Sequence, residues 1–250
     1  MNKPAKKILL YSTPGIGKTY MLSTLRLDSR TSPVLWLDFE GGFSTFEKHA
    51  NFIESLKDLD KAKSDKVNVI FPKTMADVIN IVNWMTEHPK HYKSIVVDSV
   101  TYMLKNWLEE SRVAFKIKRK EMTDIPDRAD YQNVSGKIWK VIDALGENPF
   151  VDSVWFTAWE GKDTDERGTI TSIRPELSPS LRVAVTHAAT YVLRMYAEGE
   201  NRKVRTRMIG NVQAKSMVSF DVPTVIDISN DPKRELCVVK PLLDKVVFVQ

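Results

Sequence analysis

The residues best suited to chemistry in this chain form the run STPGIGKT at positions 12–19. The run follows a short apolar stretch and opens a helical pattern, so several backbone N–H groups can point at one phosphate. Its glycines permit the backbone conformation that such a cradle requires. Lys18 is expected to reach the β- and γ-phosphates of a nucleotide, and the Thr19 hydroxyl to coordinate Mg²⁺. The predicted nucleotide-binding residues are Thr13, Pro14, Gly15, Ile16, Gly17, Lys18, Thr19 and Tyr20.

A second candidate is Asp98, which ends the apolar run SIVVD. Ligands of parallel-sheet proteins bind at the carboxyl ends of strands, so Asp98 is expected to lie beside the phosphate loop. An acidic residue in this place can hold magnesium, usually through a water molecule. Asp98 can also cap the helix that starts at Ser99, and the two roles are compatible.

Hydrolysis further requires a group that orients or deprotonates the attacking water. In many P-loop ATPases a Glu directly follows the metal-binding Asp, but Ser99 stands there in this chain, so the carboxylate must come from elsewhere. Glu40 is the candidate, because it follows the apolar run VLWLDF and Gly41-Gly42 leaves room for a γ-phosphate. A turn residue with a solvated carboxylate is the alternative reading of Glu40.

Short apolar runs alternate with helix-period stretches over the first two thirds of the chain. Strands are expected at 7–11, 34–38, 67–71, 94–98 and 154–157, and helices at 18–27, from Thr74 with a capping box to Asp77, after Asp98, and at about 130–145. This alternation predicts an α/β fold with a mostly parallel central sheet flanked by helices. From Lys162 onward, hairpin signals at 167–168 and 198–201 predict an antiparallel extension.

Composition excludes several classes of protein. With 42% hydrophobic and 28% charged residues, the 250-residue chain is neither disordered nor fibrous. The single cysteine excludes an intrachain disulfide and a cysteine-based zinc site. Neither a signal peptide nor a membrane span is expected, which predicts a cytoplasmic protein without a membrane partner. The net charge of +5 is compatible with nucleic acid but does not imply it.

The motifs together resemble a known family. KILLYSTPGIGKT, LDFEGG and VVDSV, with the acid after the second of these strands, resemble the RecA-type core of P-loop ATPases. Within that group the chain resembles the phage nucleotide-binding proteins of the Sak single-strand annealing type, and FTAWEG, AATYVLRM and the stretch 202–215 extend the likeness. The resemblance implies a RecA-like ATPase core at 1–220 and leaves 221–250 as a tail of unknown role.

The resemblance also implies roles for residues. It implies that Lys18 and Thr19 bind the phosphates and the metal, that Asp98 supports the metal, and that Glu40 activates water. The implied cofactors are ATP and Mg²⁺. Ser12 departs from the family pattern, which has Gly at that position.

Two further departures concern a polar sensor residue and a Lys-x-Arg finger motif of the family. Trp159 stands where relatives often carry a polar sensor, which leaves Thr157 or Glu160 for that work. The run AKSM at 214–217 resembles a Lys-x-Arg finger whose Arg has become Met217. In those relatives the finger reaches the active site of the adjacent subunit, so Lys215 is expected to act there as a catalytic cation.

DNA contacts in RecA-type proteins come from two loops, and this chain has two candidates. The first is the basic run KIKRK at 116–120 and the second is the stretch 162–174; the predicted DNA-binding residues are Lys116, Lys118, Arg119, Lys120, Lys162 and Arg167. A solvated helix end explains the basic run equally well.

Two other features allow a role in DNA binding without requiring it. The Trp159 ring can stack on a base, or it can pack in the protein core. One strand face carries Lys203, Arg205 and Arg207. This face can simply be exposed to solvent, or it can contact DNA or the triphosphate bound by a neighbouring subunit.

These observations predict an ATP-hydrolysing, RecA-like phage-type protein that binds single-stranded DNA and promotes annealing or recombination. Its expected partners are single-stranded DNA, further copies of itself assembled head to tail in a ring or filament, and a single-strand binding protein, in the host cytoplasm if a phage encodes it. The alternatives are a helicase, loader or packaging ATPase, and a nucleotide-gated DNA-binding scaffold with little hydrolysis. A small-molecule kinase is disfavoured, because no acceptor site or Arg-rich lid follows the phosphate loop.

Overall fold

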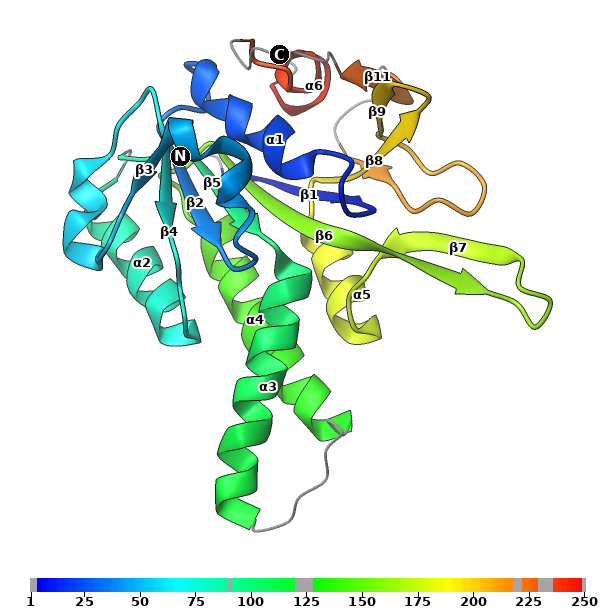
Figure 1. Cartoon of the computed structure of the whole chain (residues 1–250), viewed down its shortest axis with the longest axis horizontal. Helices are drawn as coiled ribbons and strands as arrows, with labels where there is room; N and C mark the ends of the chain where they lie inside the picture. Colours follow the sequence, from blue (N-terminus) through cyan, green and yellow to red (C-terminus); the bar gives the residue numbers. More distant parts are fainter. Residues whose placement is uncertain (1–3, 90, 120–127, 218–221, 229–235, 249–250) are drawn as a thin grey trace.

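Apolar runs of the sequence become the strands of one central sheet (Figure 1). The computed structural model describes residues 4–89, 91–119, 128–217, 222–228 and 236–248, and over 112–119 it describes the helix without its side chains. The strands are β1 Lys6–Ser12, β2 Val34–Asp38, β3 Ala50–Phe52, β4 Val67–Ile70, β5 Ser94–Asp98, β6 Ser153–Thr164, β7 Ile170–Pro175, β8 Tyr191–Glu198, β9 Asn201–Arg205, β10 Lys215–Ser216 and β11 Val225–Ile228.

Helices fill most of the connections between these strands. The α-helices are α1 Lys18–Ser23, α2 Met75–Glu87, α3 Val100–Arg119, α4 Arg128–Gly146, α5 Pro179–Ala188 and α6 Lys240–Leu242. Three 3₁₀ segments lie at Thr24–Leu27, Gly42–His49 and Leu56–Lys61, and a π-helical turn lies at Leu243–Val247. Among the helices of the described residues, none combines the length and the apolar composition that a bilayer crossing requires.

The strands follow the order β11-β9-β8-β1-β6-β5-β2-β4-β3, and β10 and β7 pair with β8 and β6. All neighbours from β8 to β3 along this order are parallel, whereas β9, β10 and β11 pair antiparallel at one end of the sheet and β7 pairs antiparallel with β6. The expected mostly parallel sheet with an antiparallel extension is therefore confirmed.

Each face of the sheet buries its own apolar core. Helices α2, α3, α4 and α5 cover one face, where Ile81, Met103, Ile138 and Leu181 are buried. Helix α1 and the C-terminal segment cover the other face (Figure 1). Strands that are buried on both faces read as continuous apolar runs, which is why the sequence marks the central strands so clearly.

Most of the expected elements occur, with some differences. Strands β2 and β5 have the expected bounds, and the capping box of Thr74 and Asp77 is present at the start of α2. The fifth expected strand is longer: β6 runs out of the body and returns as β7 around the turn at Gly168. The expectation of strands and turns after Lys162 missed α5, although Pro179 at its first position is a helix-start signal.

The segment after residue 221, which the sequence analysis set apart as a tail, contributes to the same sheet and core. Strand β11 pairs with β9, and Leu242, Val246 and Val247 are buried against the face that α1 covers. The side chain of Arg30 donates to both Asp28 and Asp244 and so ties the π-helical turn Leu243–Val247 to the loop after the 3₁₀ segment Thr24–Leu27.

Candidate nucleotide site

The phosphate loop joins β1 to α1 at the carboxyl end of the sheet. Gly15 and Gly17 have φ values of 81° and 100°, a region that glycine occupies without steric cost. The Lys18 ammonium donates to the Ser12 hydroxyl at 2.9 Å and to the Ser12 carbonyl at 3.3 Å. The serine that replaces the usual glycine therefore supplies a hydrogen-bond partner for Lys18.

Lys18 is buried and surrounded by acidic side chains. Burial lowers the pKa of its ammonium, whereas the negative charges of Asp98, Glu40 and Glu160 raise it. Carboxylates from the end of β5, from the loop after β2 and from β6 thus act on one lysine. A buried ammonium is costly unless it is paired, so these carboxylates help to keep Lys18 charged.

Asp98 lies next to Thr19 at the carboxyl end of β5. The Thr19 hydroxyl donates to Asp98 Oδ2 at 3.0 Å, and the Thr157 hydroxyl donates to Asp98 Oδ1 at 2.5 Å. Burial raises the pKa of the Asp98 carboxyl to about 6, assisted by the negative charges of Glu40 and Asp38 and opposed by the two threonine hydrogen bonds. Thr157, one of the two expected sensor residues, therefore contacts the expected metal-binding carboxylate.

The loop that carries Glu40 is organised by Asp38, which the sequence analysis did not single out. Asp38 Oδ1 accepts from the backbone N–H groups of Glu40 at 3.0 Å and Gly41 at 2.7 Å, and Oδ2 accepts from that of Phe43 at 3.0 Å. A Cβ atom at Gly42 would lie 3.1 Å from Asp98 Oδ2. The missing side chain keeps this position open beside Asp98 and Thr19.

Two side chains, one directly after β5 and one on β6, hold the carboxylate of Glu40. The Ser99 hydroxyl donates to Oε2 at 2.8 Å, and the indole N–H of Trp159 donates to Oε1 at 3.0 Å. The Lys105 ammonium lies 3.8 Å from the centroid of the Trp159 ring. Trp159, which stands where the sequence analysis expected a polar sensor, thus donates a hydrogen bond to Glu40.

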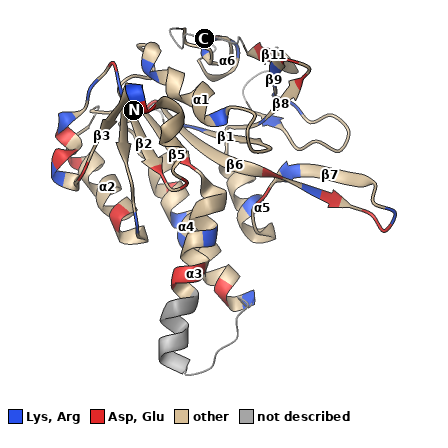
Figure 2. Cartoon of the chain, viewed as in Figure 1, with Lys and Arg blue, Asp and Glu red and all other residues tan. Residues whose placement is uncertain are grey.

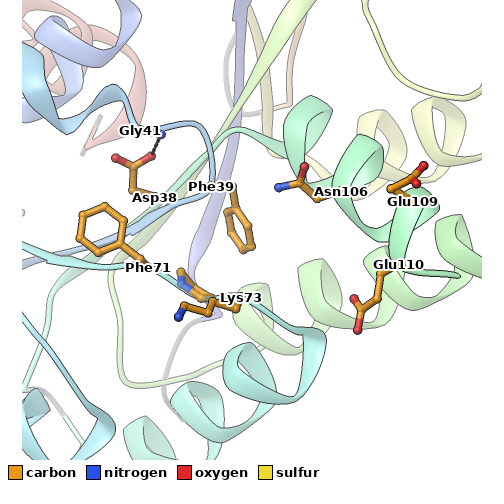
Figure 3. Close-up of a pocket in the computed structure, with 9 residues that line it drawn as sticks. Asp38, Phe39, Gly41, Phe71, Lys73, Asn106, Glu109 and Glu110 are labelled. Atoms are coloured by element: carbon orange, nitrogen blue, oxygen red, sulfur yellow. Dashed lines mark hydrogen bonds between the residues drawn. The ribbon is translucent and has the colours of Figure 1, made fainter. Parts of the chain in front are cut away.

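A surface cavity of about 500 Å³ opens beside the Glu40 loop (Figure 3). Its lining consists of Asp38, Phe39, Gly41, Phe71, Pro72, Lys73, Asn106, Glu109 and Glu110. It borders the backbone that Asp38 fixes rather than the phosphate loop. The cavity is therefore a neighbour of the site and not the place expected for a nucleotide.

Two other expected site residues have protein partners of their own. Glu160, the second sensor candidate, forms an ion pair with Arg194 at 2.8 Å. Lys215 donates to the carbonyl groups of Thr186 at 3.1 Å and His187 at 3.0 Å, at the C-terminal end of α5. It pairs with Val192 near the start of β8, whereas the phosphate loop follows the end of β1.

The expected DNA-binding residues that the structure describes lie on two elements that point in different directions. Lys116, Lys118 and Arg119 belong to the part of α3 without described side chains, and Lys120 lies outside the described residues. Lys162 and Arg167 lie on the β6–β7 hairpin, which Figure 1 shows extending away from the body while α3 extends along another axis. Both signs of charge occur on the hairpin (Figure 2), and Arg174 pairs there with Asp163.

Mg²⁺ fits the groups around Thr19. It commonly keeps several waters and takes few protein ligands beside the substrate phosphates. One hydroxyl and one buried carboxylate, Thr19 and Asp98, meet at 3.0 Å next to the side-chain-free Gly42. In the part of the chain that the structure describes, no three His, Cys, Asp or Glu side chains form a group that could hold a metal alone.

Comparison with known proteins identifies a family. Residues 4–219 match the profile of a family described as an AAA domain. No curated protein matches the chain. Solved structures with some likeness include the RadB recombinase, at 15% identity and a TM-score of 0.45 over 81% of this chain and 80% of that one.

Two further structures have a similar degree of likeness. The genome packaging NTPase B204 from Sulfolobus turreted icosahedral virus 2, in complex with ATP-gammaS, is 16% identical, with a TM-score of 0.44 over 80% of this chain and 78% of that one. A prototypical ATPase from the type III secretion system of pathogenic bacteria is 12% identical, with a TM-score of 0.41 over 77% of this chain and 51% of that one.

Proposed function

The chain belongs to the AAA domain family, and from that premise we propose that it binds and hydrolyses ATP at the phosphate loop. The convergence of Lys18, the Thr19–Asp98 pair and the Glu40 carboxylate carries this proposal. These groups come from the carboxyl ends of β1, β5 and β2, the edge at which parallel sheets bind ligands.

Each group has a distinct task in the proposed reaction. The Lys18 ammonium binds the β- and γ-phosphates, and the backbone N–H groups of the loop orient the phosphate chain. Thr19 and Asp98 hold Mg²⁺, which supplies charge neutralisation when bound. The Glu40 carboxylate, oriented by Ser99 and Trp159, accepts a proton from the attacking water.

We further propose that the protein is a RecA-like, phage-type protein that binds single-stranded DNA and promotes annealing or recombination while assembled head to tail. The likeness of its motifs to Sak-type proteins, the basic run at 116–120 and the projecting β6–β7 hairpin support this finer assignment. Lys215 is the proposed cation supplied to the neighbouring subunit. A single-strand binding protein is a proposed additional partner, and the host cytoplasm is the proposed location.

Phosphate release from ATP with and without single-stranded DNA, measured alongside sedimentation, tests the proposal. We expect turnover that DNA stimulates and an assembly that ATP and DNA enlarge. DNA affinity should fall with salt, and neutralising Lys116, Lys118, Arg119 and Lys120 should flatten that dependence. ATP binding without measurable turnover would instead identify a nucleotide-gated scaffold, and a strictly monomeric protein would remove the head-to-tail assembly.

A further inference from the structure

A second cation, Arg202, lies against the phosphate loop on the side opposite Glu40. A Cβ atom at Gly17 would lie 3.4 Å from Arg202 Nε and 3.7 Å from Nη2. The guanidinium carbon is 6.0 Å from the centroid of the Tyr20 ring. Both neighbours, Gly17 and Tyr20, belong to the predicted nucleotide-binding run, although Arg202 is far away in sequence.

The surrounding strands fix where Arg202 points. Arg202 pairs with Ala197 on β8 and with Ile228 on β11, so its backbone is held from both sides. Val204, two residues along the same strand and therefore on the same face, is fully buried in the core that contains Tyr20. The C-terminal strand β11 thus helps to position a cation at the phosphate loop.

The order of the strands tells which part of a nucleotide this cation would meet. β1 lies between β8 and β9 on one side and β6, β5 and β2 on the other. The γ-phosphate must face Asp98 and Glu40, on the β5 and β2 side, because metal binding and water activation occur there. The remainder of the phosphate chain is then nearer to β9.

We propose that Arg202 binds the α- and β-phosphates of the bound nucleotide, in the same subunit as the phosphate loop. This inference rests on the proposed function, because it requires the nucleotide to occupy that loop. Arginine suits the role, since its planar guanidinium can donate two parallel hydrogen bonds to phosphate oxygens. A contact with these two phosphates is shared by ATP and ADP, so it contributes to affinity for both.

Binding of ADP and of a non-hydrolysable ATP analogue to Arg202→Gln, measured calorimetrically with Mg²⁺, tests the inference. We expect both affinities to fall about 10- to 100-fold, the effect of losing a hydrogen bond between charged groups. Arg202→Lys should lie between Arg202→Gln and the wild type, because it keeps the charge and loses the paired geometry. Lys203→Gln is the matched control: Lys203 is the next residue on the opposite strand face, where it pairs with Glu198, and its replacement should leave both affinities unchanged.

Each other outcome overturns a defined statement. Wild-type affinities in Arg202→Gln, with affinity lost in Lys18→Ala, would remove Arg202 from the site and leave the proposed function intact. Wild-type affinity in Lys18→Ala as well would remove the nucleotide from the phosphate loop and overturn the proposed function itself. Loss for the ATP analogue alone would contradict the α,β assignment. A lowered melting temperature in Arg202→Gln together with unchanged affinity would identify a packing residue.

Discussion

The phosphate loop lies between two unlike sides of the sheet. On the β5 and β2 side, Asp38, Asp98 and Glu40 are acidic and are held by hydrogen bonds from hydroxyl, indole and backbone N–H groups. On the β9 side, Arg202 is basic and lies against the backbone of Gly17. The acidic side can bind metal and activate water, whereas the basic side can only bind and neutralise phosphate.

This difference separates two tasks that a nucleotide site must perform. Removing groups on the acidic side should slow hydrolysis with little change in nucleotide affinity, because the proposed function places those groups at the γ-phosphate and the attacking water. Removing the cation on the basic side should weaken nucleotide binding, with little change in the rate of hydrolysis at saturating ATP. Lys18 lies between the two sides and should affect both.

The largest effect is expected for Lys18→Ala. Lys18 is the cation that the loop itself presents to the β- and γ-phosphates, so its loss should abolish ATP binding. Equilibrium binding of ATP measures this directly. Unchanged nucleotide affinity in the variant would contradict the assignment of the phosphate loop.

Glu40→Gln should separate chemistry from binding. The amide keeps the size of the side chain but cannot accept the proton of water, so hydrolysis should slow at least about 100-fold at near-normal ATP affinity. Phosphate-release assays and binding assays on one preparation give both values. A wild-type rate would reduce Glu40 to a turn residue and make Glu160 the next candidate.

Lys215→Ala tests whether the active site of one subunit uses a cation from the adjacent subunit. The variant should bind ATP normally and hydrolyse it about 10-fold more slowly, the scale of one lost charge-assisted hydrogen bond. Mixed with Glu40→Gln, it should recover activity, because an intact Lys215 can meet an intact Glu40 across the interface.

The same variant has an opposing interpretation. In one subunit, Lys215 donates to the last carbonyl groups of α5, a role that stabilises a helix end. A lowered melting temperature with a normal rate, and no recovery in mixtures, would leave Lys215 with that structural role alone.

Trp159→Phe should have the smallest effect, a decrease in kcat of about 3- to 10-fold. The ring remains to pack near Lys105, but Glu40 loses its indole donor and keeps the hydroxyl donor of Ser99. ATP affinity should not change, which separates positioning of Glu40 from loss of the fold. Trp107→Phe is the control, since among the described residues its indole N–H has no hydrogen-bond partner. Equal effects of the two variants would contradict the positioning role of Trp159.

The sequence predicted the parts of the fold that depend on local pattern. The apolar runs VLWLD and SIVVD each become a strand with the expected bounds, because parallel strands buried on both faces need such runs. The placement of Asp98 beside Thr19 followed from the rule that parallel strands present their carboxyl ends at one edge. The roles of these residues stay predictions.

The remaining features depend on which strands become neighbours. Glu40, Ser99 and Trp159 come together although about 60 residues separate each from the next along the chain. The spacing of the motifs does not give the strand order that brings them together. Arg202 approaches Gly17 for the same reason, and the sequence analysis did not single it out, because the alternating basic residues Lys203, Arg205 and Arg207 lie on the opposite face of its strand. Asp38 was overlooked because it ends an apolar strand, although an Asp at the start of a Gly-containing turn is a signal for a side chain that accepts from turn N–H groups.

The most direct test of the division between the two sides is to measure, on matched preparations of Glu40→Gln and Arg202→Gln, the affinity for ATP and the rate of phosphate release at saturation. We predict that Glu40→Gln keeps its affinity and loses at least about 100-fold in rate. Arg202→Gln should lose about 10- to 100-fold in affinity and keep a rate near that of the wild type. If Glu40→Gln weakens binding while its rate at saturation is unchanged, the acidic side does not carry the chemistry and the account is wrong.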